Sequence, residues 1–379
     1  MALVLTEEQT MLRDMAKDFF TEQVPVTNLR KLRDEEDADG FDKAVWQQIL
    51  ELGFAGILIP EEHGGTGFGP MGLGIVMKEA GRTLASSPLY STAVLGAGLI
   101  IAAGSEAQKA ALLPKIAGGE LITALALEER NHHNPLNTSM TAEKSADGYV
   151  LNGHKTFVID GHIADTLIVV ARTSRAAGDS KGLSMFLVDP KSSGVSVTRT
   201  HMVDSRNAAM IDFDGVTVSA DDALGGIDAA WPELENVLDL GRVCLAAEML
   251  GGAETVFDTT LDYLKERKQF GVIIGTFQAL KHRAAEMFCE VEICQSVVLD
   301  ALSALDERRN DIPAAASLAK ARVGDAVRLI TNEGVQLHGG IGMTDAVDVG
   351  LFLKRARVQA QMLGDSTYHR ARYADLGGY

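Results

Sequence analysis

The chain has 379 residues, of which 46% are hydrophobic, and its 35 basic and 52 acidic side chains give a net charge of −17. A chain of this length usually forms two or three domains, and this apolar fraction can fill a sizeable core. The acidic balance argues against a surface for nucleic acid or an anionic membrane. A small anionic ligand stays possible, because one local arginine can outweigh a distant net charge.

The cysteines and the N-terminus exclude several further classes. The three cysteines, Cys244, Cys289 and Cys294, are too few and too irregularly spaced for a disulfide framework or a zinc site, so we expect buried free thiols and no metal. The first ten residues lack the basic and long apolar regions of a signal peptide. No run approaches the roughly 18 apolar residues that cross a bilayer. We therefore expect a cytoplasmic protein without a membrane partner.

Residues 1–120 are predicted to form an N-terminal helical domain. Thr6 is placed to cap the first helix, because threonine commonly precedes an apolar pattern of helical period. We expect the apolar face of that helix to include Met11, Met15, Phe19 and Phe20. Further helical runs follow at 41–52, 71–83, 93–103 and 106–116, with a Gly-rich turn at 60–70.

Residues 121–228 are predicted to form a middle β domain. Short runs rich in β-branched and aromatic residues alternate with Gly, Asp and Ser, which is typical of strands joined by turns. The runs lie at 149–151, 166–171, 183–188, 195–198 and 210–218.

Residues 229–379 return to a helical period in longer elements. The runs at 234–267, 277–309, 314–337 and 346–372 predict a C-terminal bundle of about four antiparallel helices. The fold class is therefore mainly α with a middle all-β domain, in the order α–β–α.

A segment of aromatic, cationic and amide side chains follows the first bundle helix, and it contains Tyr263, Arg267, Phe270, Gly271, Phe277 and Gln278. It resembles the Y-x-x-x-R-x-x-F-G…F-Q segment of the acyl-CoA dehydrogenase family, whose α–β–α order the whole chain shares. The resemblance implies that Arg267 binds the FAD pyrophosphate of a neighbouring subunit, beside Phe270, Phe277 and Gln278. A guanidinium suits this role, because its planar fork matches phosphate oxygens. The alternative is a solvated arginine at a helix end with two core phenylalanines.

A Gly-rich turn follows the third bundle helix, at 336–344. It resembles the family's Q-x-x-G-G-x-G-x-T turn, which lies against the adenosine end of FAD, and glycine lets the backbone pass close to a ligand. The resemblance implies contacts to FAD from Gln336, Leu337, His338, Gly339 and Gly340. The alternative is a helix C-cap with ordinary glycines.

Two charged residues of the first bundle helix, Asp239 and Arg242, stand three apart on one face. They resemble the pair that family members direct toward the CoA–substrate cavity, so the resemblance implies a substrate-binding role. The alternative is a surface ion pair.

The middle domain departs from the family pattern. At the place of the usual T-E-P-x-x-G-S-D stretch this chain has residues 127–134, in which only Glu128 matches. His132 and His133 could contact flavin or a CoA phosphate, or could be exposed loop histidines. The usual W-I-T segment is here Phe157, Val158 and Ile159. Phe157 can stack on a flavin, whereas Ile159 cannot donate the hydroxyl hydrogen bond of the usual threonine.

The catalytic base also departs from the family pattern. The position of the usual Glu near the C-terminus is Leu363, and the position used by a smaller branch is Gly241. Asp365 is the nearest carboxylate, and it is either the base or the cap of a turn or helix.

The resemblance implies an FAD-dependent acyl-CoA dehydrogenase that converts an acyl-CoA to the trans-2-enoyl-CoA. It also implies an electron-transfer flavoprotein as acceptor and an oligomer, as a dimer or a dimer of dimers. Two alternatives stay open. One is a non-catalytic or half-site subunit of a heteromeric enzyme, and the other is a flavin oxidase or monooxygenase on the same fold.

Overall fold

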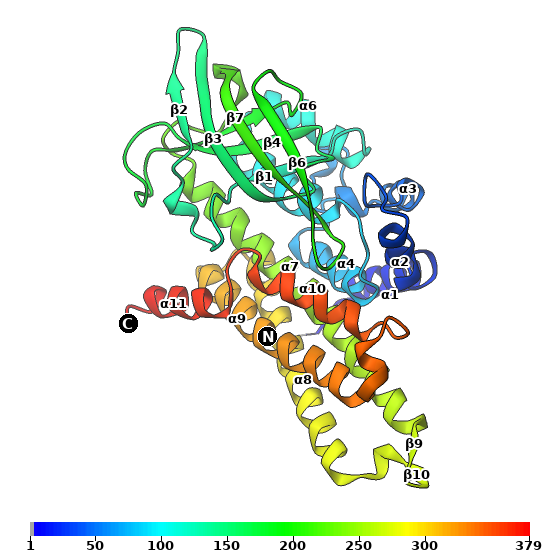
Figure 1. Ribbon diagram of the computed structural model, residues 1–379. Coiled ribbons are helices and arrows are strands. Elements are labelled where there is room, and N and C mark those ends of the chain that lie inside the picture. Colours follow the sequence, from blue (N-terminus) through cyan, green and yellow to red (C-terminus); the bar gives the residue numbers. More distant parts are fainter. Residues whose placement is uncertain (1–3) are drawn as a thin grey trace. The chain divides into compact units, whose positions relative to one another are not determined.

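A computed structural model describes residues 4–379, and the chain divides into two compact units. The helical unit comprises Met1–Lys31, Pro70–Ala85 and Arg242–Tyr379. The mixed unit comprises Leu32–Gly69 and Ser86–Gly241. The predicted fold class, mainly helical with a middle β region, is confirmed (Figure 1). The domain bounds 1–120, 121–228 and 229–379 stay a prediction about the sequence.

The mixed unit is built on one eight-stranded sheet. Seven of its strands follow the order β6-β7-β3-β2-β4-β5-β8, and the eighth, β1, pairs in parallel with β4. All five predicted strand runs lie in this sheet. The strands β1, β2 and β8 were not predicted, because runs of two to four residues give too little periodicity. Strand bounds are β1 Thr123–Ala126, β2 Thr141–Lys144, β3 Gly148–Ile159, β4 Thr166–Arg172, β5 Leu183–Val188, β6 Val195–His201, β7 Asn207–Ser219 and β8 Ala223–Leu224.

Side chains that alternate between buried and exposed along the strands supply the core of this sheet. In β7, burial alternates along most of the strand, as expected where one sheet face is covered. Leu151, Phe186 and Ile211 are among the fully buried side chains of the resulting cluster. The helical segments of this unit are α3 Lys43–Glu51, the π-helix η3 Tyr90–Gly96, α5 Ala97–Ala103, α6 Glu106–Ala117 and the short 3-10 turns η1 Phe54–Gly56, η2 Glu61–His63, η4 Pro135–Asn137 and η5 Ala220–Asp222.

The helical unit begins with α1 (Glu7–Gln23), which Thr6 caps as predicted. The Thr6 hydroxyl accepts from the Gln9 amide at 3.2 Å, and the Gln9 side chain accepts from the Thr6 amide at 2.9 Å, which completes a capping box. The predicted apolar face was wrong for Met11 and Met15, which are 71% and 41% exposed. The buried face of α1 is one residue further round the helix and consists of Leu12, Ala16 and Phe20.

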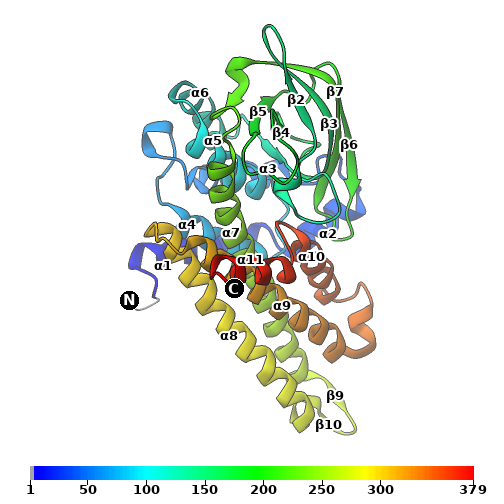
Figure 2. The ribbon, with the colours of Figure 1, turned by 90° about the vertical axis from the view of Figure 1, so that its left-hand side faces the viewer.

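Long helices form the rest of this unit (Figure 2). Helix α7 begins in the mixed unit and continues into the helical unit, and α2 lies across the same division of the chain. The fourth predicted run, 346–372, was wrong as a single helix. It is broken where Leu363 has φ +52° and Gly364 has φ +101°, a backbone that no helix can contain. The helices are α2 Val26–Asp34, α4 Pro70–Arg82, α7 Trp231–Glu266, α8 Gln278–Asp306, α9 Ile312–His338, α10 Val349–Gln361 and α11 Ser366–Leu376.

The free thiols are only partly as expected. Cys244 and Cys294 are buried, and burial raises the pKa of both thiols, so these two are inert packing groups. Cys289 is exposed on α8, which corrects the expectation that all three are buried.

Candidate functional site

A short β-hairpin with a two-residue loop lies between α7 and α8 and presents the first motif. Strands β9 (Lys268–Gln269) and β10 (Val272–Ile273) pair around Phe270 and Gly271, which have φ +54° and +79°, the backbone of a type I′ turn. A bulky residue rarely adopts positive φ, because its Cβ crowds the backbone. The hairpin therefore holds Phe270 in an unfavourable backbone conformation with its ring directed outward.

The motif side chains of this hairpin face solvent. Phe270 is 91% exposed and Phe277 is 38% exposed, and their rings meet edge to face with centroids 6.2 Å apart. The reading of these two residues as core was wrong. Arg267 and Gln278 are also exposed, and the Arg267 guanidinium has no ion pair within residues 4–379.

The Gly-rich turn, η7 (Gly339–Met343), ends α9 and meets the end of α7. The rings of Tyr263 and His338 stack with centroids 4.4 Å apart, and His338 Nδ1 lies 2.7 Å from the Gly334 carbonyl oxygen. Gln336, Gly339 and Gly340 are exposed, whereas Leu337 is 6% and His338 is 4% exposed. The structure thus brings together the two motifs, about 60 residues apart in sequence, and turns Leu337 and His338 inward.

The glycines of this turn fit a ligand better than a simple helix cap. Gly339 has φ +64°, which accounts for a glycine there. Gly340 does not have positive φ, and a Cβ added to it would meet no atom of residues 4–379 within 4 Å. The chain's own backbone and packing therefore give no reason for glycine at 340, whereas the close approach of an outside group does. An open glycine backbone, an unpaired arginine and exposed aromatic rings suit a flat cofactor that carries phosphates.

Phe157 lies at an irregularity of β3. The register between β3 and β7 shifts between Lys155 and Val158, and Phe157 has φ +52°. Such bulges redirect a side chain relative to the sheet. Phe157 is half-buried, so part of its ring is available to a ligand.

The loop that replaces the usual flavin-binding stretch is held by a network that the sequence did not indicate. Lys155 is fully buried and pairs with Glu129 at 2.8 Å, and it also donates to the Leu127 carbonyl oxygen at 3.0 Å. Glu129 accepts from the amides of Ser139 at 2.7 Å and Met140 at 3.0 Å. Burial lowers the pKa of the Lys155 ammonium, because the charged form loses its hydration. Burial opposes ionisation of Glu129 too, but its pKa stays below the ordinary value because the Lys155 charge and the hydrogen bonds outweigh it.

The two loop histidines differ from each other. His132 is exposed, as one of the two readings expected. The His133 side chain is 2% exposed, with Nδ1 2.5 Å from a carboxylate oxygen of Glu128. The reading of both as exposed was therefore wrong for His133, whose ring packs within the loop together with the one residue of that stretch that matches the family.

Asp239 and Arg242 lie three apart on α7 and are 1% and 0% exposed, so the reading as a surface ion pair was wrong. The Arg242 Nε lies 3.4 Å from the Leu363 carbonyl oxygen, and its guanidinium lies over the ring of Tyr368 at 5.9 Å. A fully buried arginine needs such partners, because an unpaired buried charge is strongly destabilising. The substrate-binding role of both residues stays a prediction.

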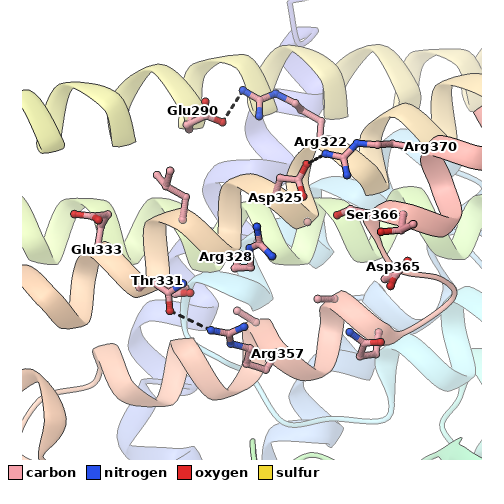
Figure 3. A pocket seen from close by; sticks show the side chains of 17 residues that line it. Glu290, Arg322, Asp325, Arg328, Thr331, Glu333, Arg357, Asp365, Ser366 and Arg370 are labelled. Carbon is pink, nitrogen blue, oxygen red and sulfur yellow. Dashed lines mark hydrogen bonds and ion pairs between the residues drawn. The ribbon is translucent and has the colours of Figure 1, made fainter. Parts of the chain in front are cut away.

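Asp365 lies where α10 gives way to α11, at a polar groove of about 730 Å³ between α8, α9, α10 and α11 (Figure 3). One Asp365 carboxylate oxygen accepts from the Tyr368 amide at 2.8 Å and caps α11. The second carboxylate oxygen has no hydrogen bond within residues 4–379, so the cap leaves it available. Leu363, at the usual base position, is 9% exposed. The same groove is lined by Arg328 and Arg357, which have no carboxylate partner in the described chain.

No helix of residues 4–379 is long and apolar enough to cross a membrane. Within the same residues, no cluster of three or more His, Cys, Asp or Glu side chains could hold a metal ion.

Family models match nearly the whole chain. The models of the acyl-CoA dehydrogenase N-terminal, middle and C-terminal domains match residues 6–120, 124–216 and 231–376. A probable acyl-CoA dehydrogenase of Bacillus subtilis is 31% identical over 97% of each chain. A caffeyl-CoA reductase–Etf complex subunit of Acetobacterium woodii is 31% identical over 94% of each chain. The structure of butyryl-CoA dehydrogenase from Megasphaera elsdenii superimposes with a TM-score of 0.90 at 26% identity, covering 100% of each chain.

Family membership shows the cofactor, FAD, and the reaction class, an oxidoreductase. The chain belongs to the acyl-CoA dehydrogenase family and is an FAD-dependent oxidoreductase.

Proposed function

We propose that this protein removes two hydrogens from the α and β carbons of an acyl-CoA thioester and releases the trans-2-enoyl-CoA. The observation that carries the proposal is the pairing of the Arg267 hairpin with the Gly339–Gly340 turn at one end of the bundle, since both are shaped for a phosphate-bearing group outside the chain. FAD, when bound, supplies the acceptor for the hydride that leaves the β carbon.

The chain's own residues would divide the remaining work. Arg267 would pair with the FAD pyrophosphate, and the open backbone at Gly340 would allow the adenosine end to approach. Phe157 would stack on the flavin ring. Asp239 and Arg242 would line the CoA–substrate cavity. Buried charges at such positions act strongly, because little water screens them.

Asp365 is the proposed base for the α-proton. It is the carboxylate nearest to Leu363, and its second oxygen is free to accept a proton while the first caps α11. Removing the α-proton needs a base within hydrogen-bonding reach of the α carbon, and a thioester carbonyl held by hydrogen-bond donors lowers the cost of that step.

We further propose that the complete site needs two chains. Arg267, Phe270 and Phe277 are exposed on their own chain, which leaves them free to contact a cofactor that a second chain also holds. The second chain is either another copy or a different subunit. The departure of residues 127–134 from the family's flavin-binding stretch favours the different subunit. The Acetobacterium relative's name places it in a complex with an electron-transferring flavoprotein, which motivates the same kind of protein as the proposed electron acceptor here.

The test is the flavin content of the purified chain, followed by anaerobic mixing with acyl-CoA thioesters of different chain types. One FAD per chain, bleached by an acyl-CoA without oxygen uptake, supports the homomeric dehydrogenase. A colourless or half-occupied chain that gains flavin and activity from a second gene product supports the heteromeric form. Oxygen consumption coupled to substrate would instead identify an oxidase or monooxygenase, and failure of every acyl-CoA to bleach a fully loaded flavin would reject the proposal.

A further inference from the structure

Lys320 is a buried cation that the catalytic proposal does not use. It lies in the N-terminal half of α9, is 1% exposed and has no carboxylate of residues 4–379 within hydrogen-bonding distance. Its ammonium instead donates to three backbone carbonyl oxygens, those of Gln359 at 3.0 Å, Ala360 at 3.3 Å and Gly364 at 2.9 Å. An ammonium has three N–H donors, so these contacts saturate it and leave none for a ligand.

The three acceptors belong to one structural feature, the end of α10 and the turn that follows it. Gln359 and Ala360 lie in the last turn of α10, where carbonyl groups lack helical partners and carry the negative end of the helix dipole. Gly364 lies in the turn itself. A single buried side chain therefore ties the end of one helix to the backbone just before Asp365.

This turn cannot hold its shape through local preferences alone. Leu363 and Gly364 have successive positive φ angles, and for leucine that conformation is unfavourable because its Cβ crowds the backbone. The Leu363 carbonyl oxygen is held by His369 Nε2 at 2.9 Å and more weakly by Arg242. Lys320 holds the next carbonyl along, so two successive peptide groups are fixed from outside the turn.

The face of α9 around Lys320 is shaped to receive the same turn. The Ser366 hydroxyl donates to the Ala321 carbonyl oxygen at 3.1 Å, one residue beyond Lys320. A Cβ added to Gly324 would lie 2.6 Å from the Ser366 hydroxyl oxygen, so this glycine allows the start of α11 to lie against α9. Lys320, Ala321 and Gly324 thus form one docking face for the turn.

We propose that Lys320 is a positioning residue, which holds the 362–365 turn against α9 and thereby sets where the Asp365 carboxylate lies in the groove. The inference rests on the proposed function for what Asp365 does, but not for where the turn lies. Lys320 itself takes no part in proton transfer, because all its donors are committed to the backbone.

The first test compares Lys320→Met with Lys354→Met, the same change at an exposed lysine of α10. Methionine keeps the length of the side chain and removes a buried charge, an exchange that proteins often tolerate. We expect Lys320→Met to fold. Amide hydrogen exchange in residues 362–368 should become faster by roughly tenfold or more, while the exchange rates of α9 stay unchanged. We expect kcat to fall on the order of 10- to 100-fold, with KM nearly constant, because a base displaced by about 1 Å loses its alignment. Lys354→Met should change neither.

Lys320→Arg restores the charge and the donors, and it should recover part of the turn's protection. Unchanged exchange in a folded Lys320→Met protein would overturn the inference, whatever happens to activity. If the unmodified protein turns over no acyl-CoA, the proposed function fails, yet the exchange experiment still decides whether Lys320 holds the turn.

A measurement on the unmodified protein covers the case in which Lys320→Met does not fold. The charged and titratable groups that face Lys320 and the turn are Arg242 on α7, Asp365 in the turn and His369 on α11. Burial, with a smaller contribution from Arg242, lowers the pKa of Lys320 to about 7, and Asp365 opposes the shift. Above that pH the amine keeps two donors for three carbonyls. Protection of 362–368, corrected for intrinsic exchange, should therefore fall between pH 6 and 9, also in a His369→Gln variant; a flat profile would contradict the inference.

Discussion

The rings of Tyr263 on α7 and His338 on α9 stack with their centroids 4.4 Å apart and their planes 27° apart. This contact joins the two segments that the sequence proposes for FAD, one on each side of the pair. Neither ring is itself a candidate for the phosphate contact. Removing the stack therefore tests whether the relative placement of the two motifs matters for FAD binding.

Tyr263→Ala should weaken FAD retention without removing a proposed phosphate contact. Stacked aromatic pairs contribute about 0.5–1.5 kcal/mol beyond their buried area, so we expect a roughly 2- to 12-fold rise in the dissociation constant of FAD. Tyr263→Phe keeps the stack and serves as the control. Equal retention in both variants, measured by equilibrium dialysis, would show that the stack does not set the position of the motifs.

Arg267→Ala should weaken FAD binding more strongly. The exposed guanidinium has no partner of its own within residues 4–379, so its truncation removes a charge-assisted phosphate contact of about 1.5–3 kcal/mol and leaves no internal charge unpaired. Lys265→Ala, two residues earlier in the last turn of α7, controls for loss of general positive charge. Flavin content that stays unchanged in Arg267→Ala would remove this residue from the proposed site.

Phe270→Asp should dissociate the protein and release its flavin. The ring is 91% exposed in the single chain, and a bulky apolar side chain held outward by a positive-φ turn gains stability only when another chain covers it. Tyr379→Asp, a change at a residue that is 96% exposed at the C-terminus, is the control. Light scattering of the unmodified protein should give a dimer or a dimer of dimers, and a stable monomer that retains FAD would contradict the two-chain site.

Asp365→Asn should abolish dehydrogenation and leave ligand binding and folding nearly intact. Asparagine still accepts the Tyr368 amide hydrogen bond and caps α11, so the thermal unfolding temperature should change little. Loss of proton abstraction typically costs about 10²- to 10⁴-fold in rate. Normal turnover of Asp365→Asn in an active assembly would make this residue a cap only, and the base would then come from elsewhere in this chain or from a partner chain.

Lys155→Met should destabilise the mixed unit, because it leaves Glu129 buried without its cation. Removing one member of a buried ion pair costs about 3–5 kcal/mol, and denaturant unfolding of Lys155→Met against Lys144→Met, an exposed lysine on β2, measures it. The dependence of folding stability on pH at acid pH should also change in Lys155→Met. Since the folded-state pKa of Glu129 lies below its ordinary 4.5, its contribution is present above that pH and is lost as pH falls through the folded value. A Lys155→Met protein as stable as Lys144→Met would show that the pair does not hold the loop.

Local sequence patterns were enough to predict the fold class and to single out the two motifs that we propose for FAD binding. The change from a helical to a strand period and back is local information, since it follows from which side chains each element buries. The spacing from Arg267 to Phe270 and Gln278, and the glycines of 336–344, are likewise readable along the chain. Only the tertiary structure showed that Gly340 is open, because the space around a glycine depends on residues far away in sequence.

Other features were decided by contacts that no local pattern records. The pairing of Lys155 with Glu129 and the three carbonyl contacts of Lys320 join residues 26 to 44 positions apart. A lysine in an amphipathic pattern reads as solvated, because burial of its charge depends on which backbone groups the fold brings near it. The predicted single run 346–372 missed the break between α10 and α11 for the same reason, although Asp365 reads as a possible helix cap. The Leu363 carbonyl oxygen is contacted by His369 and Arg242, and the Gly364 carbonyl oxygen by Lys320, all from other elements. Gly364 and Asp365 mark a turn in the sequence, but its shape depends on these distant contacts, which in our proposal set the position of Asp365.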